Sequence, residues 1–165
     1  MEERMERYKT IHQGSIATIT LHQIPQKPGI GAKIFDILSK NNINVKLVFH
    51  TFYKNDVSDL TLAVDKANLD ISFKLLESLK EDIKVDKIDC KKNLVIISIH
   101  YISGKMKMRA FATDVFRSIT NAQCDIDMLS ISHSTISCII PESKVKDVIF
   151  SLERRFKDEV AVHPI

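Results

Sequence analysis

The sequence predicts an α+β fold made of two βαββαβ units, each an antiparallel sheet with its helices on one face. Three observations lead to this prediction. The apolar residues alternate between a period of two, typical of strands, and a period of about 3.6, typical of helices. The resulting order of strands and helices occurs twice along the 165 residues. Apolar residues make up 44% of the chain and charged residues 27%, which is the composition of a globular protein.

The first unit begins with a strand in which Ala17, Ile19 and Leu21 alternate with polar residues. Pro28 and Gly29 then interrupt the pattern and begin a helix, since a proline there lacks only an N–H that would be unpaired anyway. The apolar positions of the later elements are Ile30, Ile34, Ile37 and Leu38 for a helix, Val45, Leu47 and Phe49 for a strand, Leu60, Leu62 and Val64 for a strand, Leu69, Phe73, Leu76 and Leu79 for a helix, and Val85 and Ile88 for a short closing strand.

The second unit repeats this order. Its apolar positions are Val95, Ile97 and Ile99 for a strand, Ala112, Val115, Phe116 and Ile119 for a helix, Ile126 and Met128 for a strand, Ile136, Cys138 and Ile140 for a strand, Val145, Val148, Ile149, Leu152 and Phe156 for a helix, and Val160 and Val162 for a last strand. At one constant offset, Asn44 and Val45 match Asp125 and Ile126. We therefore expect units at residues 16–88 and 89–165, packed together because units this small bury little core alone.

Glycine is scarce, since the chain has only 4 glycines and 4 prolines. Gly29 and Gly31 form the one close pair, and no Gly-Lys-Ser/Thr follows them, so a phosphate-binding loop is missing. The net charge of +3 is too small to indicate binding to nucleic acid or to anionic lipid, and the basic cluster at residues 105–109 is interpreted as a solvated loop. The sequence thus predicts no catalytic residue, no cofactor and no nucleic-acid or membrane partner.

Cysteines and histidines do not indicate a metal site. The cysteines are Cys90, Cys124 and Cys138, and the histidines weighed with them are His50, His100 and His133. These residues lack the closely spaced pairs of ligands that zinc sites have, so we predict no metal. We interpret Cys138 as a small buried apolar residue. No apolar run reaches about 18 residues and no signal peptide is visible, so we expect a cytoplasmic protein.

Several segments together resemble a known family. They are residues 24–29 (IPQKPG), 32–35 (AKIF), 43–45 (INV), 59–62 (DLTL), 125–132 (DIDMLSIS), 135–140 (TISCII) and 152–156 (LERRF). This joint pattern is similar to the paired ACT domains of the aspartokinase regulatory region, over roughly residues 16–156. The resemblance implies two ferredoxin-like units, the second completed by an N-terminal strand near residues 9–15.

The resemblance also implies a function. Such pairs sense an amino acid, usually lysine or threonine, for feedback control of aspartate phosphorylation. They form homodimers by joining sheets side by side, and the effector lies between the first repeat of one chain and the second repeat of the other. The implied partner is an aspartokinase catalytic domain or subunit, and some family members make the regulatory half as a separate subunit, which this short chain resembles.

By the same resemblance, the effector-binding residues are Gln26, Lys27, Pro28, Gly29, Ile30, Gly31, Asn44, His50, Ala112, Asp125 and Ile126. These residue types suit an amino-acid ligand. A Pro-Gly pair at a helix start lets backbone N–H groups approach the ligand's α-carboxylate, which the helix dipole also attracts. The ligand's ammonium group needs an acceptor or a carboxylate.

Some of these positions depart from the family pattern. Gln26 stands where the family commonly has Asp, His50 where it has Gln, and Asp125 where it has Asn. The second repeat has Arg109 and Ala110 in place of its Pro-Gly pair. One hypothesis is that the carboxylate lost at Gln26 is regained at Asp125. The alternative is that the pair serves only as a structural dimerisation module without an effector.

Overall fold

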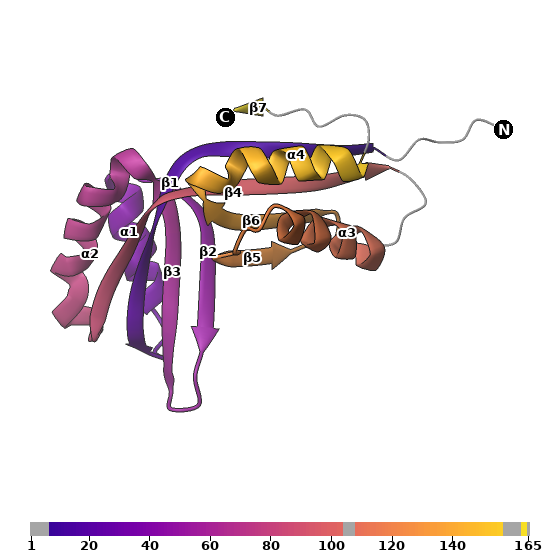
Figure 1. Ribbon diagram of the computed structural model, residues 1–165. Coiled ribbons are helices and arrows are strands. Elements are labelled where there is room, and N and C mark those ends of the chain that lie inside the picture. The colour runs from indigo at the N-terminus through magenta and orange to yellow at the C-terminus, as the bar shows by residue number, and fades with distance from the viewer. Residues whose placement is uncertain (1–6, 104–107, 157–162, 165) are drawn as a thin grey trace. The chain divides into compact units, whose positions relative to one another are not determined.

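The computed structural model describes residues 7–103, 108–156 and 163–164. The chain divides into two compact units, one formed by Ser15–Lys92 and the other by Met1–Gly14 with Asn93–Ile165 (Figure 1). Two long strands, β1 (Arg7–Pro25) and β4 (Lys87–Ser103), run across the boundaries, so each supplies residues to both units.

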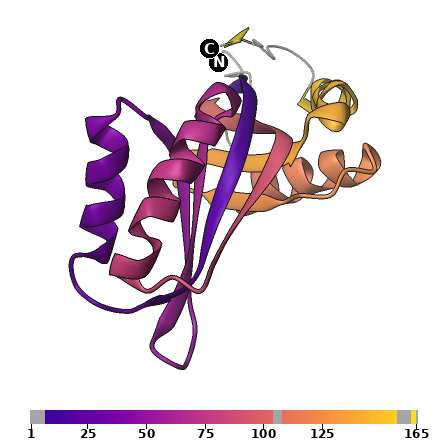
Figure 2. The ribbon, with the colours of Figure 1, turned by 90° about the vertical axis from the view of Figure 1, so that its left-hand side faces the viewer.

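The Ser15–Lys92 unit has the predicted βαββαβ order. After β1 come α1 (Ile30–Lys40), β2 (Val45–Phe52), β3 (Val57–Asp65), a short 3-10 turn (Lys66–Asn68), α2 (Leu69–Ile83) and the first part of β4. The strand order is β2-β3-β1-β4, and β3 pairs antiparallel with both β1 and β2. Figure 2 shows α1 and α2 side by side on one face of these strands.

The core of this unit lies between that face and the two helices. Ile19 and Leu21 on β1 and Leu62 on β3 are fully buried there against Ile34 and Leu38 of α1. These residues follow the predicted periods of two and of about 3.6. The helix α1 ends at this point because Asn41 caps its C-terminus and Asn42 takes a positive φ of 58°.

The other unit has the same order of elements. Its described elements after β4 are α3 (Met108–Asn121), β5 (Met128–Ile131), β6 (Thr135–Pro141), a short 3-10 turn (Glu142–Lys144), α4 (Val145–Phe156) and β7 (His163–Pro164). β6 pairs antiparallel with β4 and β5, and β7 pairs in parallel with the start of β1 at Ile11 and His12. Val160 and Val162, predicted as a last strand, lie outside the described residues.

Two details of the predicted pattern are wrong. The expected break between a strand ending near Ile88 and another near Val95 does not exist, because β4 is continuous. Lys91 and Lys92 lie within β4 with their side chains exposed. Asn93 takes a φ of 58°, which asparagine tolerates, so the strand bends there without leaving the sheet. Phe116 is 38% exposed and belongs to the outer face of α3, because Phe111, Val115 and Ile119 define the buried stripe.

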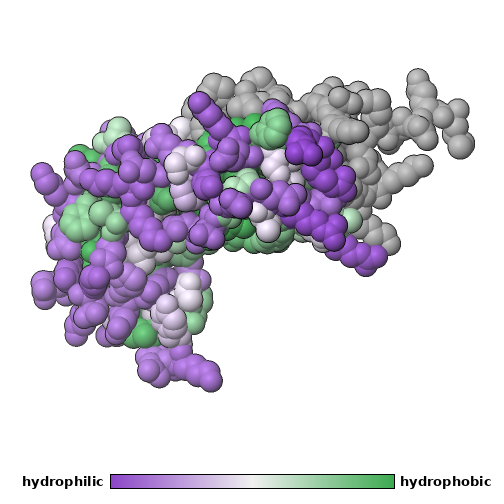
Figure 3. Space-filling view, in the orientation of Figure 1, coloured by the Kyte–Doolittle hydropathy of each residue, from purple (hydrophilic) through white to green (hydrophobic). Residues whose placement is uncertain are grey.

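Hydrophilic side chains cover most of the surface seen in Figure 3, with smaller hydrophobic patches among them. Within the described parts of the chain, no helix is long and apolar enough to cross a membrane.

Candidate functional site

A pocket of about 370 Å³ opens in the Ser15–Lys92 unit between the loop that leads into α1 and the strands β2 and β3. Of the residues predicted from the sequence, those that line it are Gln26, Lys27, Pro28, Ile30, Gly31 and His50. Its apolar lining consists of Ile24, Ile34, Phe35, Val48, Phe52 and Leu60. The described unit therefore brings the strand-to-helix loop and the predicted β2 histidine together around one cavity.

Gly29 gives the loop its shape. It caps α1 with φ 92° and ψ −16°, a left-handed conformation that glycine adopts without steric cost. A glycine cap has no side chain that could accept a hydrogen bond from the first turn. The N–H groups of Ile30, Gly31 and Ala32 have no intrahelical partner by helix geometry, and they form the positive end of the helix dipole. This end of α1 is therefore suited to a carboxylate.

Gln26 holds the loop against the hairpin that joins β2 to β3. Its backbone N–H donates to Asp56 O at 2.9 Å, and its side-chain Nε2 donates to Val57 O at 3.1 Å. These two bonds give the Gln26 amide a structural role. In this structure Gln26 fixes the wall of the pocket and offers no negative charge.

His50 and Ser58 form the polar part of the lining. His50 Nε2 lies 2.8 Å from Ser58 Oγ, and Ser58 Oγ lies 3.4 Å from Ile24 O, to which it donates. The ring of Phe52 lies 4.1 Å from the His50 ring, centroid to centroid. The sequence did not predict Ser58 as a site residue. Ser58 lies on the same face of β3 as Leu60, at a position where the alternation of the strand calls for an apolar residue. A polar residue at such a position is the signal that could have identified it.

The other predicted residues are not among the lining of this pocket. Gly29 borders a smaller neighbouring pocket of about 230 Å³, and Asn44 is exposed just before β2. Ala112 lies on α3, and Asp125 and Ile126 lie in the loop before β5, all in the other unit. Among the described residues that line the larger pocket none is acidic, so this lining offers no carboxylate to an ammonium group.

A second polar cluster surrounds His22 on β1 and lines a separate surface depression, which shares no residue with the pocket. Asp59 is partly buried, which opposes ionisation, but the Gln23 N–H, His22 and Tyr53 all donate to its carboxylate and together lower the pKa of Asp59. The ammonium group of Lys87 and then His22 lower the pKa of Asp89. Partial burial and the Asp59 carboxylate raise the pKa of Tyr53. The sequence did not predict this cluster.

The fold and the pocket together define a class of protein. Two βαββαβ units that share long strands, with a ligand-sized pocket at a strand-to-helix loop, are the architecture of paired ACT domains.

Known proteins of this class can be compared with the chain. No family model matches it. Aspartokinase 2 of Bacillus subtilis is 24% identical over 164 residues, covering 99% of this chain and 39% of that protein. The regulatory subunit of aspartate kinase from Thermus thermophilus, in its ligand-free form, has a TM-score of 0.79 at 22% identity over 90% of this chain and 97% of that chain. E. coli aspartokinase III in complex with lysine and aspartate has a TM-score of 0.64 at 17% identity over 94% of this chain and 34% of that chain.

These similarities cover nearly the whole chain. Its homologues are aspartokinases, and its structural neighbours are regulatory subunits or regulatory regions of aspartate kinases. The chain spans 39% of the length of aspartokinase 2, well under two thirds of that relative. In fold it is similar to the Thermus thermophilus regulatory subunit over 97% of that subunit.

Proposed function

We propose that this chain senses an amino acid for an aspartokinase and passes the signal to the catalytic domain or subunit. The observation that carries the proposal is the pocket at the Pro28-Gly29 start of α1, where a helix N-terminus, an apolar cavity and His50 meet. Binding regulates activity if the ligand prefers one arrangement of the protein over another.

The pocket suggests how the ligand is held. Its α-carboxylate faces the N–H groups of the first turn of α1, with Lys27 nearby as a cation. Its side chain enters the apolar part of the cavity toward Ile34 and Leu60. The α-ammonium group finds no acidic residue in the lining described, so we propose that Asp125 of a second copy supplies the carboxylate in a homodimer with side-by-side sheets.

Lysine and threonine are the proposed effectors, in keeping with the sequence resemblance. The similar E. coli aspartokinase III has been solved with lysine and aspartate. For this chain we favour threonine, because the side-chain ammonium of lysine would also need a carboxylate. Burying a charge without a partner costs far more than burying an unpaired hydroxyl group, which costs roughly 2–7 kcal/mol. A cytoplasmic location is part of the proposal and follows from the relation to aspartokinases.

A thermal-shift panel of amino acids tests the proposal. A ligand at 100 times its Kd stabilises the folded protein by about 2.7 kcal/mol, which raises the midpoint of unfolding measurably. We expect threonine to raise the midpoint of the 165-residue chain and His50→Ala to reduce that rise. The matched control is His133→Ala, since His133 is an exposed histidine of the other unit. A flat panel across all amino acids would contradict effector binding.

Titration calorimetry tests the role of Asp125 separately. If this carboxylate pairs with the ligand's ammonium group, Asp125→Ala weakens binding while Asp127→Ala, an exposed neighbour two residues along, leaves it unchanged. Equal affinities of the wild type and Asp125→Ala would overturn this part of the proposal and leave the pocket itself untouched.

A second candidate function is structural dimerisation without an effector. The observation in its favour is the exposed apolar rim of the pocket, where Phe52 is 63%, Val48 43% and Phe35 40% exposed. If this rim is a dimer contact, Phe52→Ser shifts the chain toward monomer in sedimentation velocity. A dimer that is insensitive to Phe52→Ser and Val48→Ser would exclude the rim as its interface.

A further inference from the structure

An extra residue in β1 stands immediately before the loop of the pocket. Leu21 pairs with Leu60, and the next pair is Ile24 with Ser58, so His22 and Gln23 together stand opposite Asp59 alone. This is a β-bulge, which bends the strand and redirects the residues after it. Gln23 takes a φ of 54°, which is uncommon for a residue other than glycine. Contacts from neighbouring residues are therefore needed to stabilise this backbone conformation.

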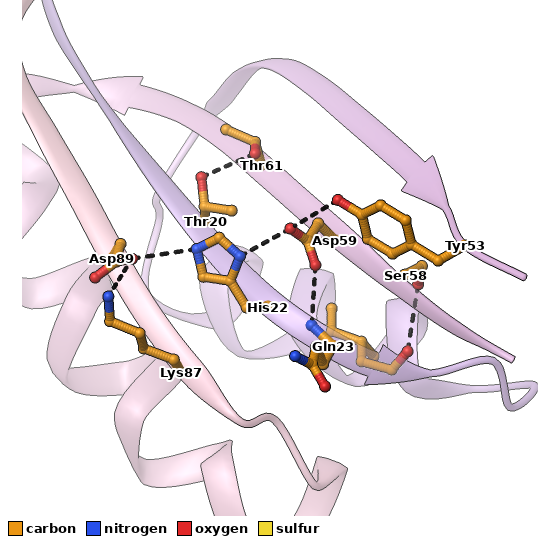
Figure 4. Close-up of polar contacts among 10 residues, drawn as sticks. Thr20, His22, Gln23, Tyr53, Ser58, Asp59, Thr61, Lys87 and Asp89 are labelled. Atoms are coloured by element: carbon orange, nitrogen blue, oxygen red, sulfur yellow. Dashed lines mark hydrogen bonds and ion pairs between the residues drawn. The ribbon is translucent and has the colours of Figure 1, made fainter. Parts of the chain in front are cut away.

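The carboxylate of Asp59 holds the bulge. Its Oδ1 accepts the backbone N–H of Gln23 at 2.9 Å, and its Oδ2 lies 2.8 Å from His22 Nδ1 (Figure 4). Tyr53, which follows the last residue of β2, donates its hydroxyl to the same Oδ2 at 3.2 Å. One side chain on β3 therefore ties together the bulge and the end of β2.

The other ring nitrogen of His22 faces a second carboxylate. His22 Nε2 lies 3.2 Å from Asp89 Oδ2 on β4, and the backbone N–H of Asp86 donates to His22 O at 3.2 Å. A neutral imidazole has one N–H donor and one acceptor nitrogen, whereas the protonated ring donates from both. Only the imidazolium form can therefore donate a hydrogen bond to a carboxylate at each of its two nitrogens.

We propose that His22 is a proton-dependent positioning residue for the pocket. As the imidazolium it clamps the bulge of β1 between β3 and β4, and loss of the proton releases one of the two carboxylate contacts. The segment after the bulge, residues 24–28, forms one wall of the pocket, and Ser58, next to Asp59 in β3, forms another. A change of pH then changes how well ordered this wall of the pocket is. The effect of that change on effector affinity rests on the proposed function.

Several charged groups surround His22. Asp59 on β3 and Asp89 on β4 contact its ring, and Asp86, the residue before β4, lines the same surface depression. Lys87 is the opposing cation, but it is paired with Asp89 at 2.8 Å. Tyr53 contributes no charge at neutral pH. Three carboxylates against one lysine make this depression negative near neutral pH, where a histidine changes its charge.

Amide hydrogen exchange of the 165-residue chain tests the proposal without a ligand. The reporter is the Gln26 N–H, which donates to Asp56 O at 2.9 Å and opens when the loop separates from the hairpin. After correction for the intrinsic pH dependence of exchange, we expect its protection factor to fall several-fold between pH 6 and pH 8.5. In His22→Gln, which cannot titrate, the protection factor stays constant over this range. The matched control, His133→Gln, retains the wild-type fall.

Ring nitrogen shifts of His22 in the wild type provide a second measurement that needs no variant. The Gln26 protection is expected to change with the same midpoint as the His22 ring nitrogens. A wild-type protection factor that does not change with pH, or a fall that persists in His22→Gln, would overturn the proposal.

Ligand titrations at two pH values distinguish this inference from the proposed function. If threonine binds, its affinity is expected to fall between pH 6 and pH 8.5 in the wild type and to remain level in His22→Gln. If no amino acid binds at either pH, the proposed function fails, and the exchange and ring measurements still decide the role of His22.

Discussion

His50 Nε2 lies 2.8 Å from Ser58 Oγ across the β2–β3 hairpin, and this contact joins the two strands that wall the pocket. Ser58 is only 2% exposed, so its hydroxyl is satisfied by His50 and by the carbonyl of Ile24 rather than by solvent. The pocket thus has a polar part made by two strands and the loop, surrounded by apolar side chains.

Removing this hydroxyl is expected to destabilise the protein. Ser58→Ala leaves the carbonyl of Ile24 without the hydroxyl donor, and the typical cost of one such bond is about 1 kcal/mol. Urea unfolding measures the difference. The control is Ser78→Ala, because Ser78 is exposed and donates only within α2, to Leu75 O. Equal effects of the two changes would contradict the role described for Ser58.

Two glycines at the start of α1 are expected to respond to alanine in opposite directions. At Gly29, φ is 92°, so Gly29→Ala strains the backbone and lowers the free energy of unfolding by about 1–2 kcal/mol. Gly31 lies in the first turn of α1 with nothing within 4 Å of an added Cβ, so Gly31→Ala stabilises the helix by up to about 1 kcal/mol. Urea unfolding of both variants checks the signs. A shift of the same sign in both would refute these roles of the two glycines.

Asp59 is expected to make the protein sensitive to acid. Its folded-state pKa is lowered, so the unfolded chain takes up the proton first as the pH falls. The stabilisation is fully present above the unfolded pKa, at about 3.9, and is lost as the pH falls through the folded value. The stability difference between wild type and Asp59→Asn should therefore be constant from pH 5 down to about pH 4 and shrink below it.

Chemical unfolding at a series of pH values measures this difference. Asp56→Asn is the matched control, since Asp56 is exposed in the same hairpin and its φ of 53° suits asparagine equally well. A difference between wild type and Asp59→Asn that does not change between pH 5 and pH 2.5 would show that the Asp59 contacts do not depend on its charge.

The three cysteines are expected to react at very different rates. Cys90 is exposed, whereas Cys124 and Cys138 are buried. Burial, with a smaller effect from Cys124, raises the pKa of Cys138 to about 12, so it holds almost no thiolate at pH 8. A thiol-disulfide reagent should modify one cysteine quickly in the native protein and three after unfolding. Cys90→Ser should remove the fast phase, and a fast phase that survives this change would contradict the burial described.

The sequence was sufficient for the order of the elements because burial here follows local periodicity. Ile34 and Leu38 recur at helical spacing and Ile19 and Leu21 at strand spacing, and all four are buried as predicted. The continuity of β4 could not be read in the same way. The polar residues before Asn93 interrupt the alternation of apolar residues, and only pairing with neighbouring strands keeps them extended.

The pocket could be predicted in part. Pro28, Gly29 and the residues beside them form a local motif, which the sequence displays directly. The partners of His22 could not be found in this way, because Asp59 is 37 residues away and meets it only through a bulge that shifts the register of β1. Such contacts depend on strand pairing, which the periodicity of one strand does not specify.

Amino-acid binding at the pocket beside the start of α1 is the central proposal for this protein. Its most direct test is a titration of the isotope-labelled 165-residue chain with threonine, and with lysine in parallel, followed by NMR shifts of backbone amides. We predict saturable shifts at Gly29, Gly31 and His50, with threonine acting at lower concentration than lysine. Saturable shifts confined to other residues, or none with any amino acid, would contradict the proposal.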